Sequence, residues 1–399
     1  MLRRSKILLV SLIIFGVVIL ALCGFLLITN YRLGKIPAMT FKETLEYVTK
    51  KDSKTIITVG FIKNGKVSYK VYGENAKELP AELYIYEIGS LTKTFTAALI
   101  NKAVKEGKIN IEDSLEKYLS LPSNKKYPTI KELLTHTSGY KSHYFERSMI
   151  KNFFKGRNDF YGVSKESVLK KVCKISLKKD DYKFNYSNFG FAVLGLVLES
   201  IYKCDYVTLL NDFAQKELGL SSTKISDKSG NLGNYWDWDK NDAYLPAGAI
   251  TSNIEDMLLY AKMQLEENPL FDDCHKSLKK VDGSNKMSKS IGINIDEIGM
   301  SWIIDTENNL VWHNGGTGHY NSYLGFNKKT GNGVVVLANY PPSMSKIPAT
   351  VIGIKLLKEL DEAEKTEPSR RSPLKYGKHS FWENLFVVEA MIKIMELFL

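Results

Sequence analysis

Ser90 and Lys93 are the first residues in this chain whose types and spacing could support chemistry. A serine at the start of a helix places a lysine three residues later on the same face, where the amine can reach the hydroxyl. The free N–H groups and the positive dipole end of a helix N-terminus help to keep that amine deprotonated, so that it can activate the serine as a nucleophile. Gly89 permits close approach of the backbone. The same pattern also fits a serine that only caps a helix.

Tyr186 and Asn188 form a second group, directly before an apolar segment at 189–202 that we expect to be a buried helix. A phenol beside a lysine can have its pKa lowered by the positive charge, and it could then act as a general base on the serine hydroxyl. The Asn188 amide could donate to a substrate carbonyl or hold Lys93 in place. The alternative for these residues is a helix N-cap beside a ring that faces the core.

His313, Gly315 and Gly316 form a third group, at the end of a predicted strand. Glycines at this point would let a substrate approach the strand edge closely, and the N–H of Gly316 could join that of Ser90 in an oxyanion hole. The histidine would line the site, offering a donor or polarising the proton-transfer pair. The alternative is a glycine pair in a loop with a surface histidine. A metal is not expected, because no third ligand with plausible spacing accompanies His313 and His319.

Segments with clear periodicity must position these groups. Through residues 55–73 the side chains alternate between two faces, and Asn64-Gly65 supplies a turn, so this segment predicts a β-hairpin. Helices are expected after Ser90 and over 254–265. Later strands and a last helix are expected at 300–304, 310–313, 322–326, 334–338 and 347–360. Strands at both ends with helices between them predict an α+β fold, in which both ends of the domain form one antiparallel sheet with helices on its faces and a helical insertion.

Residues 7–28 form an apolar run whose only clearly polar member is Ser11. As a helix, this run would be long enough to cross a hydrocarbon core of about 30 Å. The basic residues Arg3, Arg4 and Lys6 precede it and favour a cytoplasmic N-terminus. We therefore expect an uncleaved single-pass anchor in the cell membrane with the main domain extracytoplasmic. A cleaved signal peptide is the alternative.

The expected organisation has four parts. A flank and anchor span 1–30, a linker and first helix span 31–54, the main domain spans 55–362, and a basic linker with an amphipathic segment spans 363–399. The net charge of +11 fits either a lysine-rich composition or attraction to an anionic polymer or lipid surface. No nucleic-acid-binding signature is present, so nucleic acid is not an expected partner. The four cysteines show neither a disulfide-framework pattern nor metal-ligand spacing.

The three groups occur once each, in the order S-x-x-K, Y-x-N and H-x-G, and in this order the chain resembles the serine β-lactamase-related hydrolases. That family includes class C β-lactamases, D,D-peptidases, esterases and penicillin-binding proteins. The segments 133–139 and 246–252 also resemble segments common in the family, and the similarity covers roughly 54–360. The fold that it implies is the β-lactamase/transpeptidase-like α+β fold.

The resemblance implies that Ser90 is the nucleophile, that Lys93 and Tyr186 are the proton-transfer pair, and that Asn188 is a ligand of the substrate or of the lysine. It places His313 where true class C β-lactamases carry the lysine of their K-T-G strand motif. A lysine there suits a substrate carboxylate, whereas histidine is found in many esterase and peptidase members. Efficient hydrolysis of β-lactams is therefore less expected.

Two further features lie near these motifs in the sequence. His136, inside the segment 133–139, is expected to be structural. The aromatic and acidic loop 235–238, together with Tyr244, could line a substrate cleft or recognise an amine, or it could simply pack beneath a long loop.

The expected function is that of a membrane-anchored extracytoplasmic serine hydrolase. It would act through a covalent acyl-enzyme on a D-amino-acyl peptide or ester of the cell envelope, and it would need no metal or organic cofactor. A β-lactamase is one alternative, and a non-catalytic penicillin-binding receptor of the same fold is another. The complete set of serine, lysine and tyrosine argues against the receptor.

Overall fold

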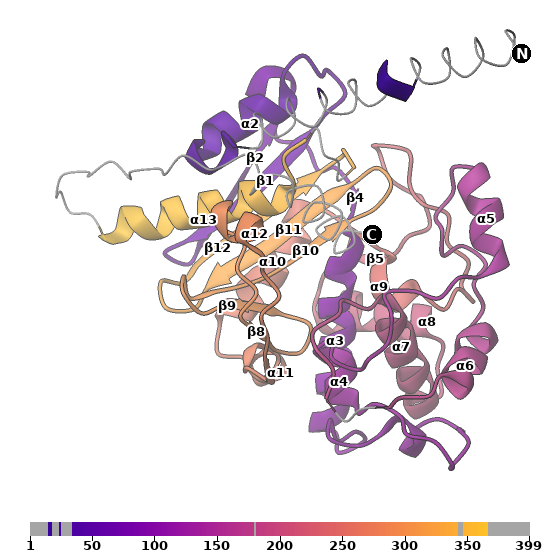
Figure 1. Cartoon of the computed structure of the whole chain (residues 1–399). Helices are drawn as coiled ribbons and strands as arrows, with labels where there is room; N and C mark the ends of the chain where they lie inside the picture. Colours follow the sequence, from indigo (N-terminus) through magenta and orange to yellow (C-terminus); the bar gives the residue numbers. More distant parts are fainter. Residues whose placement is uncertain (1–14, 18–23, 25–33, 179–180, 342–345, 366–399) are drawn as a thin grey trace, which may run out of the picture.

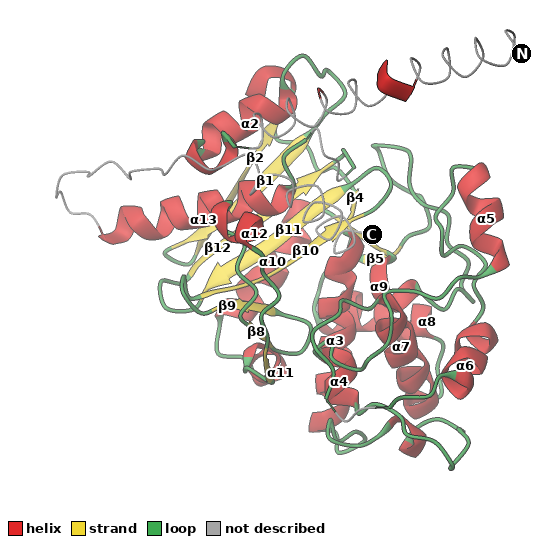
Figure 2. Ribbon diagram, viewed as in Figure 1, coloured by secondary structure: helices red, strands yellow, loops and turns green. Residues whose placement is uncertain are grey.

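The computed structural model describes residues 15–17, 24, 34–178, 181–341 and 346–365. The main element of this part of the chain is one antiparallel sheet of nine strands (Figure 2). In spatial order these strands are β3 (Glu78–Leu79), β2 (Lys66–Tyr72), β1 (Ile57–Lys63), β12 (Asn332–Ala338), β11 (Asn321–Asn327), β10 (Leu310–Gly316), β9 (Ile303–Asp305), β8 (Glu297–Ile298) and β7 (Lys279–Lys280).

The centre of this sheet joins strands from opposite ends of the chain. β1 pairs with β12, with Ile57 opposite Ala338, so the early hairpin adds directly to the late strands. Successive residues of β12 belong to different cores: Val334 and Val336 pack into one, and Val335 packs into the other. Because side chains alternate across a strand, the sheet is buried on both faces.

Helices cover the two faces (Figure 1). α2 (Phe41–Thr49) and α13 (Ala349–Lys365) contact each other and cover one face. α10 (Ile254–Leu265) packs on the other face against β1 and β12. Gly60 of β1 allows this close packing, because a Cβ there would lie within 3 Å of the Leu258 side chain.

A mostly helical part lies beside the sheet, and it includes a small sheet of three strands in the described residues. These strands are β4 (Tyr86–Glu87), β6 (Ile250–Ser252) and β5 (Lys224–Ile225). The remaining helices are α3 (Thr92–Lys105), α4 (Ile130–Leu134), α5 (Arg147–Phe154), α6 (Lys165–Lys174), α7 (Asn188–Tyr202), α8 (Tyr206–Asp212), α9 (Leu245–Gly248), α11 (Pro269–Asp272) and α12 (Lys286–Ser290).

The α+β fold and its main elements are confirmed. The hairpin, the helix after Ser90, the buried helix and the helix at 254–265 form where the sequence predicts them. The strand expected at 300–304 is shorter, because Ser301 adopts a positive φ and its N–H donates to the Leu134 carbonyl. The strand expected at 310–313 is longer, because its pairing with β11 continues to Gly316.

The expectation that a transmembrane helix precedes this fold is wrong for the part of the chain that the structure describes. No helix in the described part of the chain is both long and apolar enough to span a membrane. Most of 7–28, where that helix was expected, lies outside the described residues. So do residues 366–399 of the basic linker and amphipathic segment expected at 363–399, whose first residues belong to α13. The domain boundaries at 30, 54 and 362 stay predictions.

Candidate active site

Ser90 lies at the junction between the small sheet and α3. β4 ends at Glu87, and a 3-10 turn, η3 (Gly89–Leu91), leads directly into α3. Gly89 has a φ of 51°, and a Cβ on it would lie 2.6 Å from the backbone nitrogen of Gly316. Only glycine fits such a close contact in this conformation. The nucleophile predicted from the sequence is therefore held beside the end of β10.

Lys93 is fully buried, one turn after Ser90, and its amine contacts three oxygen atoms. Nζ lies 3.0 Å from Ser90 Oγ, 2.7 Å from Asn188 Oδ1 and 2.6 Å from the Ala247 carbonyl oxygen. Burial holds the pKa of this amine well below its usual value. A neutral amine can donate to Asn188 and Ala247 while its lone pair accepts the Ser90 hydroxyl proton. This geometry suits a general base.

Asn188 thus lies where one of its two predicted roles requires, as a ligand of the lysine. Ala247 was not predicted, because its contribution is a backbone carbonyl that no side-chain motif records. α9 carries this carbonyl, and the family-like segment 246–252 begins inside that helix.

Tyr186 lies against the lysine, with Lys93 Nζ 4.8 Å from the centre of its ring. The sequence predicted a lowered phenol pKa, and that prediction is wrong in direction. Burial raises the pKa of Tyr186, and the neighbouring Ser90 hydroxyl only partly opposes the rise. The Tyr186 hydroxyl forms no hydrogen bond with another described residue. A neutral phenol at this point suits the delivery or relay of a proton rather than its first removal.

Two histidines flank the phenol. The rings of His136 and Tyr186 have centroids 4.4 Å apart, and those of His313 and Tyr186 are 6.4 Å apart. His313 Nδ1–H donates to the Asn314 carbonyl at 2.7 Å, so its Nε2 is an acceptor. His136 Nδ1 accepts from the Ser187 N–H at 3.1 Å, so its Nε2–H is a donor.

Both imidazoles are neutral. Burial lowers the pKa of His313 to about 3. Burial also holds the pKa of His136 well below its usual value. The Nε2 atoms of both rings and the Tyr186 hydroxyl have no hydrogen-bond partner among the described residues. Buried polar groups normally find partners, so these three groups could each form a hydrogen bond with a polar group that enters the site. His136 was expected to be structural, and its sequence gave no sign of this ring contact.

The two glycines of the third motif bring β10 against the nucleophile. A Cβ on Gly315 would lie 2.0 Å from the Ile88 carbonyl oxygen and 2.6 Å from Ser322 Oγ. Ser322 Oγ in turn donates to the same carbonyl at 2.7 Å. Gly316 follows at the contact with Gly89. The structure therefore brings all seven predicted residues together around one point, and the oxyanion role of Gly316 stays a prediction.

Glu87 is a buried acid beside this point that the sequence patterns did not single out. Its carboxylate accepts from the Trp236 N–H at 2.5 Å and from Thr317 Oγ1 at 2.6 Å. It therefore ties the aromatic loop to the residue after Gly316. Burial raises the pKa of this carboxyl to about 7. Its one sequence signal was its position, three residues before Ser90.

We expect Glu87→Gln to remove a pH dependence of stability. A carboxyl with a raised folded-state pKa binds more protons when folded, so folding stability falls as pH rises from about 4.5 to about 7. The loss is at most about 3 kcal/mol. The buried histidines act in the opposite direction in both proteins, so the test is the difference between them: from pH 5 to pH 8, urea unfolding should show the stability of the wild type falling relative to that of Glu87→Gln. The exposed Glu78→Gln is the control, and a difference between wild type and Glu87→Gln that does not change with pH would contradict this role of Glu87.

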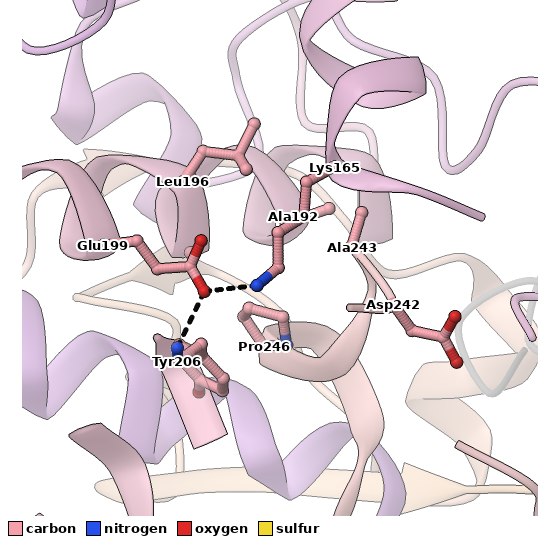
Figure 3. Close-up of a pocket in the computed structure, with 9 residues that line it drawn as sticks. Lys165, Ala192, Leu196, Glu199, Tyr206, Asp242, Ala243 and Pro246 are labelled. Atoms are coloured by element: carbon pink, nitrogen blue, oxygen red, sulfur yellow. Dashed lines mark hydrogen bonds and ion pairs between the residues drawn. The ribbon is translucent and has the colours of Figure 1, made fainter. Parts of the chain in front are cut away.

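Behind Lys93, which lies outside the labelled residues of Figure 3, the helices α7 and α9 are in close contact (Figure 3). A Cβ on Gly195 would lie 2.3 Å from Pro246 Cγ. The Glu199 carboxylate accepts from Lys165 Nζ at 2.6 Å and from the Tyr206 N–H at 2.7 Å, which joins α6, α7 and α8. The cavity between these residues is only about 10 Å³, enough for a single water at most. This region supports the site and does not hold a substrate.

We expect Gly195→Ala to destabilise the fold by about 1–3 kcal/mol, because the new methyl group must push α9 away from α7. Activity should fall with it, since α9 carries the carbonyl that orients Lys93. Thermal unfolding and ester hydrolysis measure the two effects. Gly190→Ala on the same helix is the matched control, because its Cβ would meet nothing nearer than 3.4 Å. Equal behaviour of the two variants would contradict this account of the packing.

Known proteins resemble this chain both in sequence and in fold. A family model described as "Beta-lactamase" matches residues 52–354. The protein flp of Staphylococcus aureus strain MW2 is 28% identical over 311 residues, which are 70% of this chain and 58% of that protein. This chain thus spans less than two thirds of the length of that relative.

Two solved structures show the likeness of fold. A beta-lactamase/D-alanine carboxypeptidase from Yersinia pestis has a TM-score of 0.64 at 18% identity, covering 82% of this chain and 98% of that one. A D-stereospecific amidohydrolase from Streptomyces sp. has a TM-score of 0.57 at 18% identity, covering 76% of this chain and 96% of that one. At these identities the likeness establishes the fold alone.

Proposed function

We propose that this chain, which belongs to the beta-lactamase family, is a serine hydrolase that acts by acyl transfer on a D-amino-acyl peptide or ester of the cell envelope. The observation that carries the proposal is the buried Lys93 amine 3.0 Å from Ser90 Oγ, with Asn188 and Ala247 holding its other two contacts. The fold is shared with proteins described as a D-alanine carboxypeptidase and a D-stereospecific amidohydrolase, which supports a D-amino-acyl group. The net charge of +11 favours an anionic polymer as its carrier.

In the proposed reaction Ser90 Oγ attacks the carbonyl carbon and its proton passes to Lys93 Nζ. The N–H groups of Ser90 and Gly316 stabilise the oxyanion. Tyr186, as a neutral phenol, delivers a proton to the leaving group and recovers it from the lysine. Water then attacks the acyl-enzyme along the same proton path, and Ser90 is released.

Hydrolysis of β-lactams is the second candidate, favoured by the family match. His313 argues against its efficiency, because burial lowers the pKa of this imidazole to about 3 and leaves it uncharged at neutral pH. A neutral acceptor does not attract the carboxylate of a β-lactam as a lysine ammonium would.

A substrate panel tests the proposal. D-alanyl p-nitroanilide, a D-alanyl ester, the matching L-alanyl compounds and nitrocefin are assayed with the wild type and with Ser90→Ala. We expect turnover of the D-alanyl compounds that depends on Ser90, and slow turnover of nitrocefin. Fast nitrocefin hydrolysis with no D-alanyl turnover would favour the β-lactamase. A single round of acylation without turnover would favour the receptor.

A further inference from the structure

A second hollow lies between α5 and the loop that contains Trp236, outside the catalytic group. Its volume is about 390 Å³, which falls within the range of small-molecule sites and accommodates an aromatic side chain. The buried side chains of Met149 and Phe160 line it. Two further lining residues on α5, Ile150 and Phe153, are 50% and 74% exposed. A concave site with exposed apolar side chains at its edge is typical of a surface that binds a ligand.

The hollow also carries charge. His143 and Asp159 line it, and the Asp159 carboxylate forms no ion pair in the described part of the chain. Partial burial raises the pKa of Asp159, and His143 opposes the rise. An acidic group beside several apolar side chains suits a ligand that has both an apolar part and a cation.

Trp236 joins this hollow to the catalytic group. It lines the hollow, while its backbone N–H donates to Glu87, three residues before the nucleophile. Its indole nitrogen lies 2.6 Å from the position of a Cβ on Gly318, two residues after Gly316. Trp236 therefore connects the wall of the hollow to the segments that carry Ser90 and Gly316.

Phe160 provides a second connection. Its ring stacks on Tyr244, with centroids 4.3 Å apart and an angle of 18° between the planes. Tyr244 is the residue before α9, and α9 supplies the Ala247 carbonyl that orients Lys93. Two lining residues, Phe160 and Trp236, thus contact segments that lead to the catalytic lysine and to the nucleophile.

We propose that this hollow, the apolar subsite (His143, Phe145, Met149, Ile150, Phe153, Asp159, Phe160 and Trp236), binds a bulky apolar side chain of the substrate, and that Asp159 binds its ammonium group. The inference rests on the proposed function and narrows it. The substrate is an amino-acyl or short peptidyl amide or ester with a large apolar side chain and a free amino group. The contacts of Trp236 and Phe160 with the segments around the catalytic group, and the acidic side chain of Asp159, favour this occupant over a lipid surface.

Two neighbouring phenylalanines give a matched test. Phe153 lines the apolar subsite, whereas Phe154 is 82% exposed and does not. We measure kcat and KM for D- and L-phenylalanyl and alanyl p-nitroanilides with the wild type, Phe153→Asp and Phe154→Asp. The wild type should prefer the phenylalanyl compound of one enantiomer. Phe153→Asp should lower kcat/KM for it by about 10-fold or more, through KM, because a buried apolar contact is lost. Alanyl turnover should stay unchanged, as should all rates of Phe154→Asp.

An equal effect of both substitutions, or none, would overturn the inference. Equal loss of binding to anionic vesicles in Phe153→Asp and Phe154→Asp, without any change in KM, would assign the exposed phenylalanines to a lipid surface instead. Asp159→Asn tests the cation. It should raise KM for the free-amine compound several-fold and leave the N-acetylated compound unchanged, whereas equal changes for the two compounds would contradict the role of this carboxylate.

The two proposals fail in different ways. Hydrolysis of p-nitrophenyl acetate that depends on Ser90 tests the catalytic group alone, without the apolar subsite. Calorimetric binding of phenylalaninamide, in both enantiomers, to Ser90→Ala tests the apolar subsite without turnover. Loss of phenylalaninamide binding in the double variant, Ser90→Ala with Phe153→Asp, would support the apolar subsite. This holds even if the enzyme turns over none of the substrates tested. Binding that this second substitution leaves unchanged overturns it.

Discussion

Lys93→Met should lower kcat/KM for ester hydrolysis by about 10²–10⁴-fold, the range expected when a general base is lost. In the proposed reaction the lone pair of this amine accepts the Ser90 proton, while its contacts to Asn188 and Ala247 keep it oriented. Methionine has a similar length and no proton-accepting group. Steady-state kinetics and the rate of labelling by a fluorophosphonate measure the loss.

The same variant should be more stable than the wild type at neutral pH. Burial lowers the pKa of Lys93 in the folded state, so the unfolded state binds more protons and folding is penalised at neutral pH. A rise in Tm together with the loss of activity would separate catalysis from folding. Lys105→Met, on the exposed end of the same helix, is the matched control and should keep its activity. Activity above one tenth of wild type in Lys93→Met would remove the lysine from the mechanism.

Gly315→Ala should have the second-largest effect, a loss of activity of about 10²–10³-fold. The added Cβ would lie 2.0 Å from the Ile88 carbonyl oxygen, and backbone cannot yield as a flexible side chain does. The strand end must therefore move away from the segment that carries Ser90. The Gly316 N–H would move with it, and the oxyanion donors would no longer converge.

Kinetics on a small ester isolate this effect, because such a substrate needs little besides the nucleophile and the oxyanion donors. The fold should lose about 1–3 kcal/mol of stability as the strands separate. Gly333→Ala is the control within the same sheet, because its Cβ would meet only side-chain atoms, at 3.3 Å or more. Full activity of a folded Gly315→Ala would show that the contact is not needed for catalysis.

The sequence predicted the parts of the site that depend on local order. Ser90 and Lys93 are one helical turn apart, so their contact at 3.0 Å follows from helix geometry alone. The alternation of apolar residues likewise predicted the hairpin and the late strands. The meeting of Tyr186 and His313 with that pair required the family resemblance, because no local pattern relates residues so far apart.

The remaining features depend on burial, which a linear pattern does not contain. The direction of the Tyr186 pKa was wrong because the prediction counted the charge of Lys93 and not the loss of solvent. The hydrogen-bonded role of Glu87 and the ring contact of His136 depend on segments that come together only in the fold. For the loop at Trp236 the sequence offered two interpretations: the structure shows its packing on Gly318, and its role in binding a substrate at the hollow stays a proposal.

The pairing of β1 with β12 has a kinetic consequence. Ile57 meets Ala338, so during synthesis the early hairpin leaves the ribosome long before its partner strand exists. Until then its open edge can accept a strand from another chain. Such distant pairing also slows folding, because a large loop must close before any contact is gained. The slow step in refolding should therefore be the arrival of the last strands at the centre of the sheet.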